Sequence, residues 1–569
     1  MCPRTVSEKS TCQDICIPIH RLPAELLASI FSFYQIDDAY AKPPSTLEKV
    51  PLASQVGRTP PLDRKSNGAW LPLMLVCRLW RSLGVSTPSF WTGVEVYKSV
   101  EWLALALERS GSTDISLSFH HLPTVHLAMQ LGVLLDSACR LRRLSFCSVR
   151  EEDLLPGGRG TLHPLFRMPM PHLRALVLPV RPRRREAIDQ HTRSSLPCVD
   201  IDVSHLPALH DLALVYATVP CQSLASFSRL RSIQLRSCTA DTSQGSLSPN
   251  QFLDLLEACR ELETLDLRSK FVSSVIAPGG PPSYTLPRAW VMPRSRSLRV
   301  DDYPGLVSWL IAQFEVPPRF IHLTGYHSTP RDWRSDPEVL TFLPLLPVDC
   351  DRRRYIPVYH PTRAVITILN HRYELKIFGD MPDMEGALTL SAYTEWSPRF
   401  FCWTRALSRG IPNAHDVLRS IPITSLTIHG DWEYSPYTTN WRSVYLPDFN
   451  SLEELSFIGR GSVVNLLSAL GPTWFYPNAV LKEPVLGWLV CPAFRRLQIK
   501  GARWEKELNE CIYFVLRQRQ SLGAPPLELQ LSVRCKGPRR AKLFHDTLAT
   551  FREQAQPLVR SLHYVLEPW

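Results

Sequence analysis

Residues 259–267 read CRELETLDL, and the spacing of the leucines in this stretch decides the fold that the sequence predicts. Leu262, Leu265 and Leu267 form the pattern L-x-x-L-x-L. One polar residue, Asp266, separates the last two leucines, which is the alternation of a β-strand buried on one face. We therefore expect a short strand here, with its leucines pointing inward.

The same pattern recurs along the chain, in the stretches CRLRRLSF, MPHLRALVL, LPALHDLAL, FSRLRSIQL, IPITSLTI, FNSLEELSF and CPAFRRLQI. The residue in the middle slot is, in order, Leu144, Leu176, Leu212, Ile233, Leu426, Leu455 and Leu497. This is the strand signature of leucine-rich repeats. The interval is 32 residues from Leu144 to Leu176 (176 − 144) and 42 from Leu455 to Leu497 (497 − 455), so the array is degenerate.

Helical stretches precede two of these strands: GVLLDSACR stands before LRRLSF, and FLDLLEACR before ELETLDL. A solenoid needs this alternation, because each unit buries its apolar face on its neighbours. Between 271 and about 361 the pattern is lost in Pro-rich sequence, where RFIHLTG and ELKIFG predict weak strands. LELQLSV predicts one more strand. From about Ala541 a capping helix is expected, with one side formed by Phe544, Leu548, Phe551, Leu558 and Leu562.

The N-terminal part has a different character. LPAELLASIFSFY (Leu22–Tyr34) predicts a helix, because Pro23 suits its first position and Glu25 its first turn. Its apolar side chains fall within an arc of roughly 160°. That arc is wider than one contact requires, so the helix can face a domain core along one edge and a partner along the other.

A polar, Pro-rich insertion at about 36–69 separates this helix from LPLMLVCRLWRSLG (Leu71–Gly84). Pro72 can open a second helix and Gly84 can close it. One apolar stripe on it contains Leu73, Val76, Cys77 and Trp80, and another contains Leu75, Leu79 and Leu83. We expect this helix to be covered on two sides. STPSFWTGVEV follows, with Trp91 as a large apolar plug beside a short strand.

These three stretches together resemble an F-box, most closely those of mushroom-forming fungi, in which an insertion commonly splits the first helix from the VCRxWR helix. The elements that carry the resemblance are Leu22, Pro23, Glu25, Leu26, Leu27, Ile30, Phe31, Val76, Cys77, Trp80, Arg81, Pro88 and Trp91. The next segment fits the same family: a helix through SVEWLALALERSG, capped by Ser99 and closed by Gly111, precedes the alternating strand ISLSF.

The resemblance implies a non-catalytic substrate receptor of a cullin-based ubiquitin ligase. Its F-box would dock on a Skp-type adaptor, and through it on a cullin. The candidate adaptor-binding residues are Leu22, Pro23, Leu26, Leu27, Ile30, Phe31, Val76, Cys77 and Trp80. For Leu27 and Trp80 we expect packing in the F-box core to be the larger role.

The repeat region would hold a target protein. In L-x-x-L-x-L the residues between and beside the leucines face the open, concave side of the strands. The candidate target-binding residues are Arg143, Ser145, Asp211, Ser232, Gln234, Thr264, Asp266, Glu454, Ser456, Arg496 and Gln498. The set is mixed in charge and polarity, and each member is also an ordinary solvent-facing strand residue.

Composition agrees with a folded chain of several domains: 569 residues, 44% hydrophobic and 21% charged. The net charge of +11 is mild for this length and does not imply nucleic acid. No apolar run approaches membrane-spanning length, and the N-terminus has no long apolar signal segment. The 15 scattered cysteines suit a reducing compartment, so we expect a cytoplasmic or nuclear protein without membrane partners.

Catalytic and metal-binding patterns are weak. We find no G-x-S-x-G, Walker loop, G-x-G-x-x-G or H-E-x-x-H, so no catalytic residue, cofactor or metal is predicted. Cys12 and Cys16 lack partners for a zinc site, and PGGRG at 156–160 is interpreted as a loop. His120 and His121 suit a strand end. Asp301 and Asp302 would face opposite sides of a strand and would not share a face of a helix, so a carboxylate dyad is not expected. The basic runs RPRRR (181–185) and DRRRY (351–355) favour solvated loops over the alternative, a nuclear-import or anionic-ligand patch.

The sequence thus predicts an α/β chain: a flexible tail at 1–17, a small all-helical F-box at 18–96, an irregular leucine-rich-repeat solenoid at 97–537 with parallel strands and convex-side helices, and a capping helix at 538–569. Two alternatives to the ligase receptor stay open. One is a leucine-rich-repeat scaffold without a ligase role, and the other is an enzyme with an unrecognised site.

Overall fold

The computed structural model describes residues 22–31, 71–120, 123–154, 160–181, 203–219, 229–240, 248–269, 271–276, 296–314, 319–327, 361–369, 372–379, 388–394, 421–432, 449–461 and 491–567, with a few shorter pieces between them. Several predictions fall outside the described residues. They concern the tail at 1–17 with Cys12 and Cys16, the insertion at about 36–69, residues 156–159 of PGGRG, His121, residues 182–185 and the DRRRY stretch.

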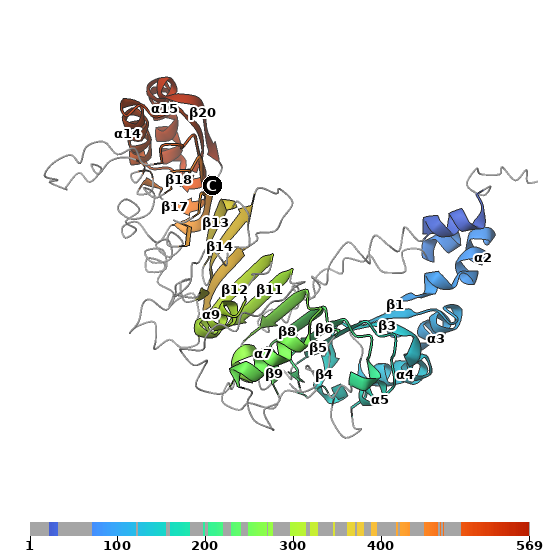
Figure 1. Ribbon diagram of the computed structural model, residues 1–569. Helices are drawn as coiled ribbons and strands as arrows, with labels where there is room; N and C mark the ends of the chain where they lie inside the picture. Colours follow the sequence, from blue (N-terminus) through green and yellow to red (C-terminus); the bar gives the residue numbers. More distant parts are fainter. Residues whose placement is uncertain are drawn as a thin grey trace, which may run out of the picture. The chain divides into compact units, whose positions relative to one another are not determined.

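The chain is a mixed α/β protein with a large, mostly parallel sheet of 18 strands (Figure 1). It divides into two compact units, residues 1–211 and residues 212–569.

The first unit begins with a helix over residues 24–31, followed by the 3-10 helix η4 (Leu71–Leu75), helix α2 (Arg78–Ser86) and the 3-10 helix η5 (Pro88–Trp91). Helical structure begins at Leu71 as predicted, but the prediction of one helix from Leu71 to Gly84 was wrong in its continuity and in its end. The backbone of Cys77 is extended, and its sulfur accepts the N–H of Trp80 at 3.5 Å, so a new helix begins after it. Gly84 lies within α2, and its carbonyl accepts the indole N–H of Trp91 at 2.9 Å.

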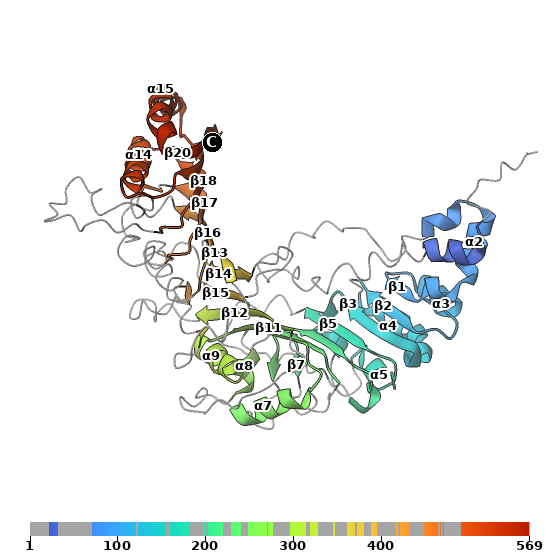
Figure 2. The same ribbon diagram turned by 45° about the horizontal axis from the view of Figure 1, so that its top comes forward.

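Four strands of the first unit pair in parallel: β1 (Gly93–Val96), β2 (Ile115–Phe119), β3 (Leu141–Phe146) and β5 (Ala175–Arg181), with the short β4 (Val149–Arg150) on β5. Its helices are α3 (Val100–Arg109), α4 (Thr124–Leu134) and α5 (His163–Phe166), with 3-10 helices at Leu135–Arg140, Glu151–Leu154 and Val203–His205. As predicted, the Ser99 hydroxyl caps α3 by accepting the N–H of Trp102, and Gly111 follows the helix with a φ of 58°. In both views α3 and α4 lie on the same face of the strands (Figure 2).

The strands of the second unit, with β6 beginning at its boundary, are β6 (Asp211–Val215), β8 (Ser232–Arg236), β10 (Thr264–Arg268), β11 (Ser297–Asp302), β12 (Phe320–His327), β13 (Pro361–Leu369), β14 (Arg372–Gly379), β15 (Leu388–Thr394), β16 (Ser425–Trp432), β17 (Glu454–Gly461), β18 (Arg496–Arg503), β19 (Leu527–Arg534) and β20 (Val559–Glu567). A separate small sheet pairs β7 (Thr218–Val219) with β9 (Thr239–Ala240). The helices are α7 (Pro249–Ala258), α8 (Phe271–Val275), α9 (Pro304–Ala312), α14 (Lys506–Ser521) and α15 (Pro538–Ala555). Helices α7, α8 and α9 lie on one face of β8–β12.

Chain order and strand order differ between β12 and β16. Strand β12 pairs in parallel with β15, β15 pairs antiparallel with β14, β14 pairs antiparallel with β13, and β13 pairs in parallel with β16. The strands predicted from RFIHLTG and ELKIFG are present as β12 and β14, whereas β11, β13 and β15 had no prediction. The reversal occupies residues 361–394 and directly follows the stretch in which the repeat pattern is lost.

The apolar core nevertheless continues through the reversal. In register order, one row of facing residues reads Ile233, Leu265, Leu298, Ile321, Leu388, Ile377, Ala364, Leu426, Leu455, Leu497, Leu529 and Leu562. All but Leu562 are buried. An antiparallel strand can join such a row because side chains alternate faces with a period of two in either direction.

A local backbone feature also repeats. Tyr216, Ser237 and Ser269 directly follow β6, β8 and β10, and their φ angles are 56°, 50° and 62°. Few non-glycine residues adopt this left-handed conformation. Three consecutive strands of the parallel sheet therefore end in the same backbone conformation, although their spacing in the sequence differs.

The C-terminal segment differs from the predicted capping helix at 538–569. Helix α15 ends at Ala555, a 3-10 turn spans Gln556–Leu558, and the chain then forms β20. Pro557 has no N–H for a continuing helical bond, and the alternating VRSLHYVL that follows suits a strand. Phe544 and Phe551 are buried under α15 as expected. Leu558 and Leu562 belong to the turn and to β20 instead of the helix.

Candidate protein-docking surfaces

An aromatic cluster holds the N-terminal helices together. The Phe31 ring meets Trp80 edge-on at 5.1 Å between centroids and lies 5.6 Å from Phe90. Leu27 is buried beside them, and all four side chains are at most 7% exposed. This contact joins the helix over residues 24–31 to α2 and η5, although a long insertion separates them in sequence.

The nine candidate adaptor-binding residues divide into two groups. Leu27, Phe31 and Trp80 lie inside this core, as expected for Leu27 and Trp80. Their buried side chains are not available for contact with an adaptor. The other six are at least partly accessible: Pro23, Leu26 and Val76 are exposed, and Leu22, Ile30 and Cys77 are half-buried.

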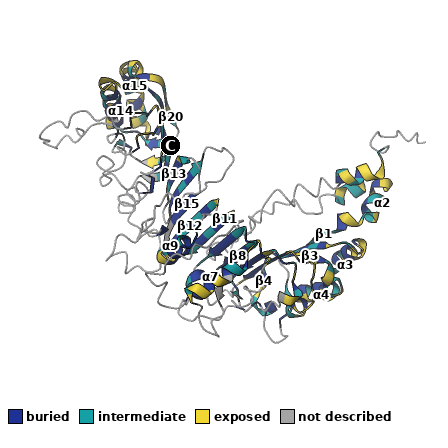
Figure 3. Cartoon of the chain, viewed as in Figure 1, coloured by how far each residue is buried: buried dark blue, intermediate teal, exposed yellow. Residues whose placement is uncertain are grey.

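Four large apolar side chains of these helices face solvent. Leu26 is 51% exposed, Leu75 is 76%, Val76 is 56% and Leu79 is 48%. We call these four residues the apolar N-terminal cluster. Figure 3 shows exposed positions along α2. Covering one such side chain in a protein contact contributes about 1.5–3 kcal/mol when the burial is complete.

Two members of the cluster, Leu75 and Leu79, were not among the predicted adaptor-binding residues. The sequence carried a signal for them, because they form the second apolar stripe of the VCRLWR segment together with Leu83. We expected that stripe to be covered. In the chain by itself Leu83 is half-buried, and Leu75 and Leu79 are uncovered.

The candidate target-binding residues lie on neighbouring strands in matched positions. Arg143 and Ser145 stand opposite Ala175 and Val177. The remaining matched pairs are Ser232 with Thr264, Gln234 with Asp266, Glu454 with Arg496, and Ser456 with Gln498. Arg143, Asp211 and Arg496 are exposed, Asp266 is buried and the others are half-buried. The structure thus brings the predicted residues together in local sets on the face opposite the leucines.

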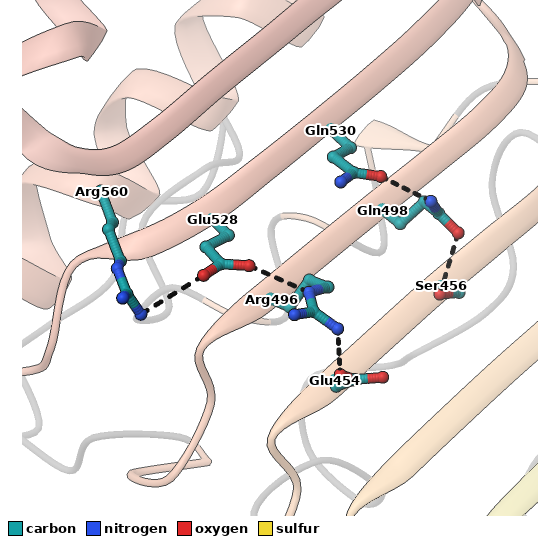
Figure 4. A network of polar contacts seen from close by, with 7 residues as sticks. All are labelled: Glu454, Ser456, Arg496, Gln498, Glu528, Gln530 and Arg560. Carbon is teal, nitrogen blue, oxygen red and sulfur yellow. Dashed lines mark hydrogen bonds and ion pairs between the residues drawn. The ribbon is translucent and has the colours of Figure 1, made fainter.

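On β17–β20 these residues form a polar ladder (Figure 4). Arg496 forms ion pairs with Glu454 and, through Nε, with Glu528 Oε2 at 3.1 Å. Arg560 Nη1 lies 3.3 Å from the other oxygen of Glu528. The hydrogen bond to Glu528 and the charge of Glu454 raise the pKa of Arg496. Acidic and basic side chains alternate along this row, so their charges balance.

A second row of the ladder is uncharged. The Ser456 hydroxyl donates to Gln498 Oε1 at 3.5 Å, and Gln498 Nε2 donates to Gln530 Oε1 at 2.7 Å. We define the polar ladder as both rows together: Glu454, Ser456, Arg496, Gln498, Glu528, Gln530 and Arg560. Glu528, Gln530 and Arg560 were not predicted. The first two could have been, because LELQLSV has the same alternation and they occupy its outward positions.

A buried charge cluster lies on β8, β10 and β11. Arg268 forms two bonds of 2.6 Å with Asp266, and Arg236 reaches the same carboxylate at 3.4 Å. Burial lowers the pKa of Arg236 to about 10. Asp266 was a candidate target-binding residue, and here its side chain is occupied by the two arginines. Asp266 therefore links β8 and β10 through these ion pairs instead of offering its carboxylate to a partner.

Asp301 and Asp302 lie on β11 and face opposite sides of it, as adjacent residues of a strand do. Asp302 is fully buried and accepts the backbone N–H groups of Ser273 at 3.0 Å and Tyr303 at 2.8 Å, so it holds the start of two helices. Burial raises the pKa of Asp301 to about 6, and the charge of Asp302 adds to the effect. The two carboxylates do not form a hydrogen-bonded pair with a shared proton.

Within the residues that the structure describes, no group of three or more His, Cys, Asp and Glu side chains is arranged to hold a metal ion. The described helices also include none that combines the length and the apolar composition needed to span a membrane.

Comparison of the chain with known protein families found no family model that matches it, and comparison with curated proteins found no match.

Proposed function

We propose that the chain is the substrate-recognition subunit of an SCF-type (Skp–cullin–F-box) ubiquitin ligase. The observation that carries this proposal is the apolar N-terminal cluster, because its four side chains are exposed on the helices that resemble an F-box. A surface of this kind gains free energy when a partner covers it. The resemblance of residues 18–96 to F-box proteins makes a Skp-type adaptor the partner.

These helices combine buried aromatic residues with exposed apolar ones, and this arrangement supports docking through an apolar contact. Phe31, Trp80 and Phe90 fix the helices against one another, so the exposed residues are held in place before a partner arrives. Pre-organisation of this kind reduces the entropy lost on binding. The half-buried Leu22 and Ile30 belong to the same helical segment and would extend the contact.

The rest of the chain is proposed to be a degenerate leucine-rich-repeat array that binds a target protein. Support comes from the continuous apolar row of β8–β20 and from the left-handed residues after β6, β8 and β10. Stacked repeats bury one face on their neighbours and leave the strand face for a partner. Tethering a target beside the charged ubiquitin-conjugating enzyme makes lysine modification effectively intramolecular, which requires no catalytic residue in this chain.

The polar ladder sets the kind of target contact that β17–β20 can make. Arg496 and Glu528 already neutralise each other, so a target gains little by offering a single opposite charge. We therefore expect the target to lie over the ladder with polar groups that continue its hydrogen bonds, such as those of Gln498 and Gln530.

The test is co-expression of the full chain with a Skp-type adaptor and a cullin, followed by purification through a tag on this chain. We expect the wild-type chain to recover both proteins. The double variant Leu75→Asp/Leu79→Asp should recover neither, because it places two charges in the contact. The matched control is Val125→Asp on α4, since Val125 is an equally exposed apolar residue outside the cluster and its replacement should leave recovery unchanged.

Two results would count against the proposal. Failure of the wild-type chain to bind the adaptor would remove the ligase role and leave a protein-binding scaffold. Recovery of adaptor by the double variant at the wild-type level would show that the cluster is not the docking surface. Circular dichroism of the double variant would check that it is folded.

A further inference from the structure

Three titratable side chains meet at the carboxyl ends of β1, β2 and β3. His120 directly follows β2 and donates its backbone N–H to the Val96 carbonyl at 3.0 Å. Cys147 directly follows β3, and its N–H reaches the Phe119 carbonyl at 2.7 Å. The strand pairing thus continues one residue past each strand, so that the two side chains lie next to each other. Glu95, on β1, stands two positions before Tyr97.

The side chains of Cys147, His120 and Glu95 lie in a line. The Cys147 sulfur lies 3.7 Å from His120 Nδ1, and His120 Nε2 lies 3.7 Å from a carboxylate oxygen of Glu95. Glu95 also accepts the Tyr97 hydroxyl at 2.7 Å. The Tyr97 ring stacks on the His120 ring, with the centroids 4.4 Å apart and the planes 4° from parallel. Cys147 is exposed as a residue, while neighbouring groups partly desolvate its thiol.

The backbone of this corner is fixed by the neighbouring helix. Gln130 on α4 is fully buried, and its amide donates to the Tyr97 carbonyl at 3.0 Å. The stacked Tyr97 then restricts rotation of the imidazole. A carboxylate, an imidazole and a nucleophile in this order are the parts of a general-base relay, in which the carboxylate orients the ring and stabilises its charged form.

We propose that Cys147 is a nucleophilic thiol, activated by His120 and Glu95, that forms covalent adducts with α,β-unsaturated carbonyl compounds. This site is independent of the ligase role proposed above.

The reaction balances with the groups at hand. His120 Nδ1 accepts the thiol proton while the sulfur forms a bond to the β-carbon of the electrophile. The π electrons of the C=C bond shift to give an enolate, and the proton on Nδ1 then passes to the α-carbon. The addition has no leaving group and requires no oxidant or reductant. Glu95 stabilises the imidazolium during the transfer.

The resting state of the thiol explains why a base is needed. Burial, together with the charge of Glu95, raises the pKa of Cys147, so the sulfur carries its proton until an electrophile is present. Base assistance of this type contributes roughly 10²–10⁴-fold to a rate. Without a base, a thiol of raised pKa would react more slowly than an ordinary exposed cysteine. With base assistance from His120, Cys147 should react faster than such a cysteine.

The chain contains its own control in Cys139, which is also exposed and lies eight positions earlier in the sequence (147 − 139). We would treat the native full-length chain with limiting N-ethylmaleimide and follow the adduct at each cysteine by peptide mass spectrometry. Cys147 should react at least about tenfold faster than Cys139. The substitution His120→Gln should lower the Cys147 rate to that of Cys139 or below, and leave Cys139 unchanged.

Two further variants separate activation from simple packing. Tyr97→Phe keeps the stacked ring and should retain most of the Cys147 rate, whereas Glu95→Gln should lower it. A wild-type Cys147 that reacts no faster than Cys139 would overturn the proposal without any variant. An unchanged Cys147 rate in His120→Gln would overturn it as well.

Discussion

Leu75 and Leu79 on the N-terminal helices, and Arg496 and Glu528 on β18 and β19, are all accessible to solvent, yet their surroundings differ. The two leucines have apolar surface that the described residues leave uncovered. The arginine and the glutamate satisfy each other, and Glu454 and Arg560 extend their pairing along the strands.

This difference separates two kinds of exposed surface. An uncovered apolar side chain costs free energy in water and therefore indicates a partner. A self-paired polar row is stable without one, because its charges and hydrogen bonds are already matched. The apolar N-terminal cluster is thus the stronger evidence for obligatory docking, and the polar ladder is a surface that a target can use but does not need.

The largest effect is expected from removing the core beneath the apolar N-terminal cluster. Phe31→Ala should destabilise the N-terminal helices by about 3–5 kcal/mol, because Phe31 is fully buried against Trp80 and Phe90. Hydrogen exchange of residues 71–91 in the full chain would measure the loss. Exchange at β17–β20 should stay as in the wild type, and equal protection of residues 71–91 in both proteins would contradict the assignment of Phe31 to the core.

A second effect, on the pH dependence of stability, is expected from Asp301 on β11, whose carboxylate is incompletely hydrogen-bonded. Asp301 Oδ1 is buried and makes no hydrogen bond with the described residues, and burial raises the pKa of this carboxyl from 3.8 to about 6. The folded state therefore holds a proton that the unfolded state has lost between about pH 4 and pH 6. Stability should fall as the pH rises through this window and level off above it.

Asp301→Asn removes this titration while keeping the shape of the side chain. At about pH 7.5 the variant should be more stable than the wild type by about 2–3 kcal/mol, and near pH 4 the two should agree. Chemical denaturation at the two pH values measures the difference. Asp302, whose pKa is also raised by burial, remains titratable in both proteins. A difference independent of pH would show that the Asp301 carboxyl is solvated.

The sequence predicts those strands in which apolar and polar residues alternate along the whole strand. Leu265 and Leu267, or Leu455 and Phe457, alternate with polar residues, and β10 and β17 lie where this alternation places them. The same pattern does not give the pairing of β13 and β15 with the antiparallel β14, because it is not a pairing of successive repeats. Pairing partners across a reversal are a tertiary property that no local spacing encodes.

The candidate sites show a similar limit. Periodicity identified the apolar stripe with Leu75 and Leu79, but not which stripe is covered, since that depends on how the helix over residues 24–31 packs on α2. The contact of Phe31 with Trp80 decides this, and it bridges an insertion of irregular composition. Likewise, spacing placed Arg496 on the outward face, and its pairing with Glu528 follows only from the register of β18 and β19.

A moderate effect is expected at the exposed surface itself. Leu75→Ala should weaken binding of the Skp-type adaptor by about 2 kcal/mol, or about 30-fold, because Leu75 is the most exposed member of the cluster. Surface plasmon resonance with immobilised adaptor would report the change. Thermal stability should be unaffected, in contrast to Phe31→Ala, and a fall in stability of similar size would mean that Leu75 supports the fold.

The smallest effect is expected in the polar ladder. Arg496→Ala should change the free energy of unfolding by less than about 1 kcal/mol, because its ion pairs are exposed and screened. Urea denaturation with and without added salt would measure it. A loss of several kcal/mol would show that the ladder is a structural element, and the contrast with the apolar N-terminal cluster would have to be revised.

The central claim is that the apolar N-terminal cluster docks a Skp-type adaptor. Calorimetric titration of the purified full chain with that adaptor tests it most directly. We expect a saturable one-to-one complex for the wild type and for Arg496→Ala with the same affinity, and no heat of binding for Leu75→Asp/Leu79→Asp. Equal binding by the wild type and the double variant, or no binding by the wild type, would contradict it.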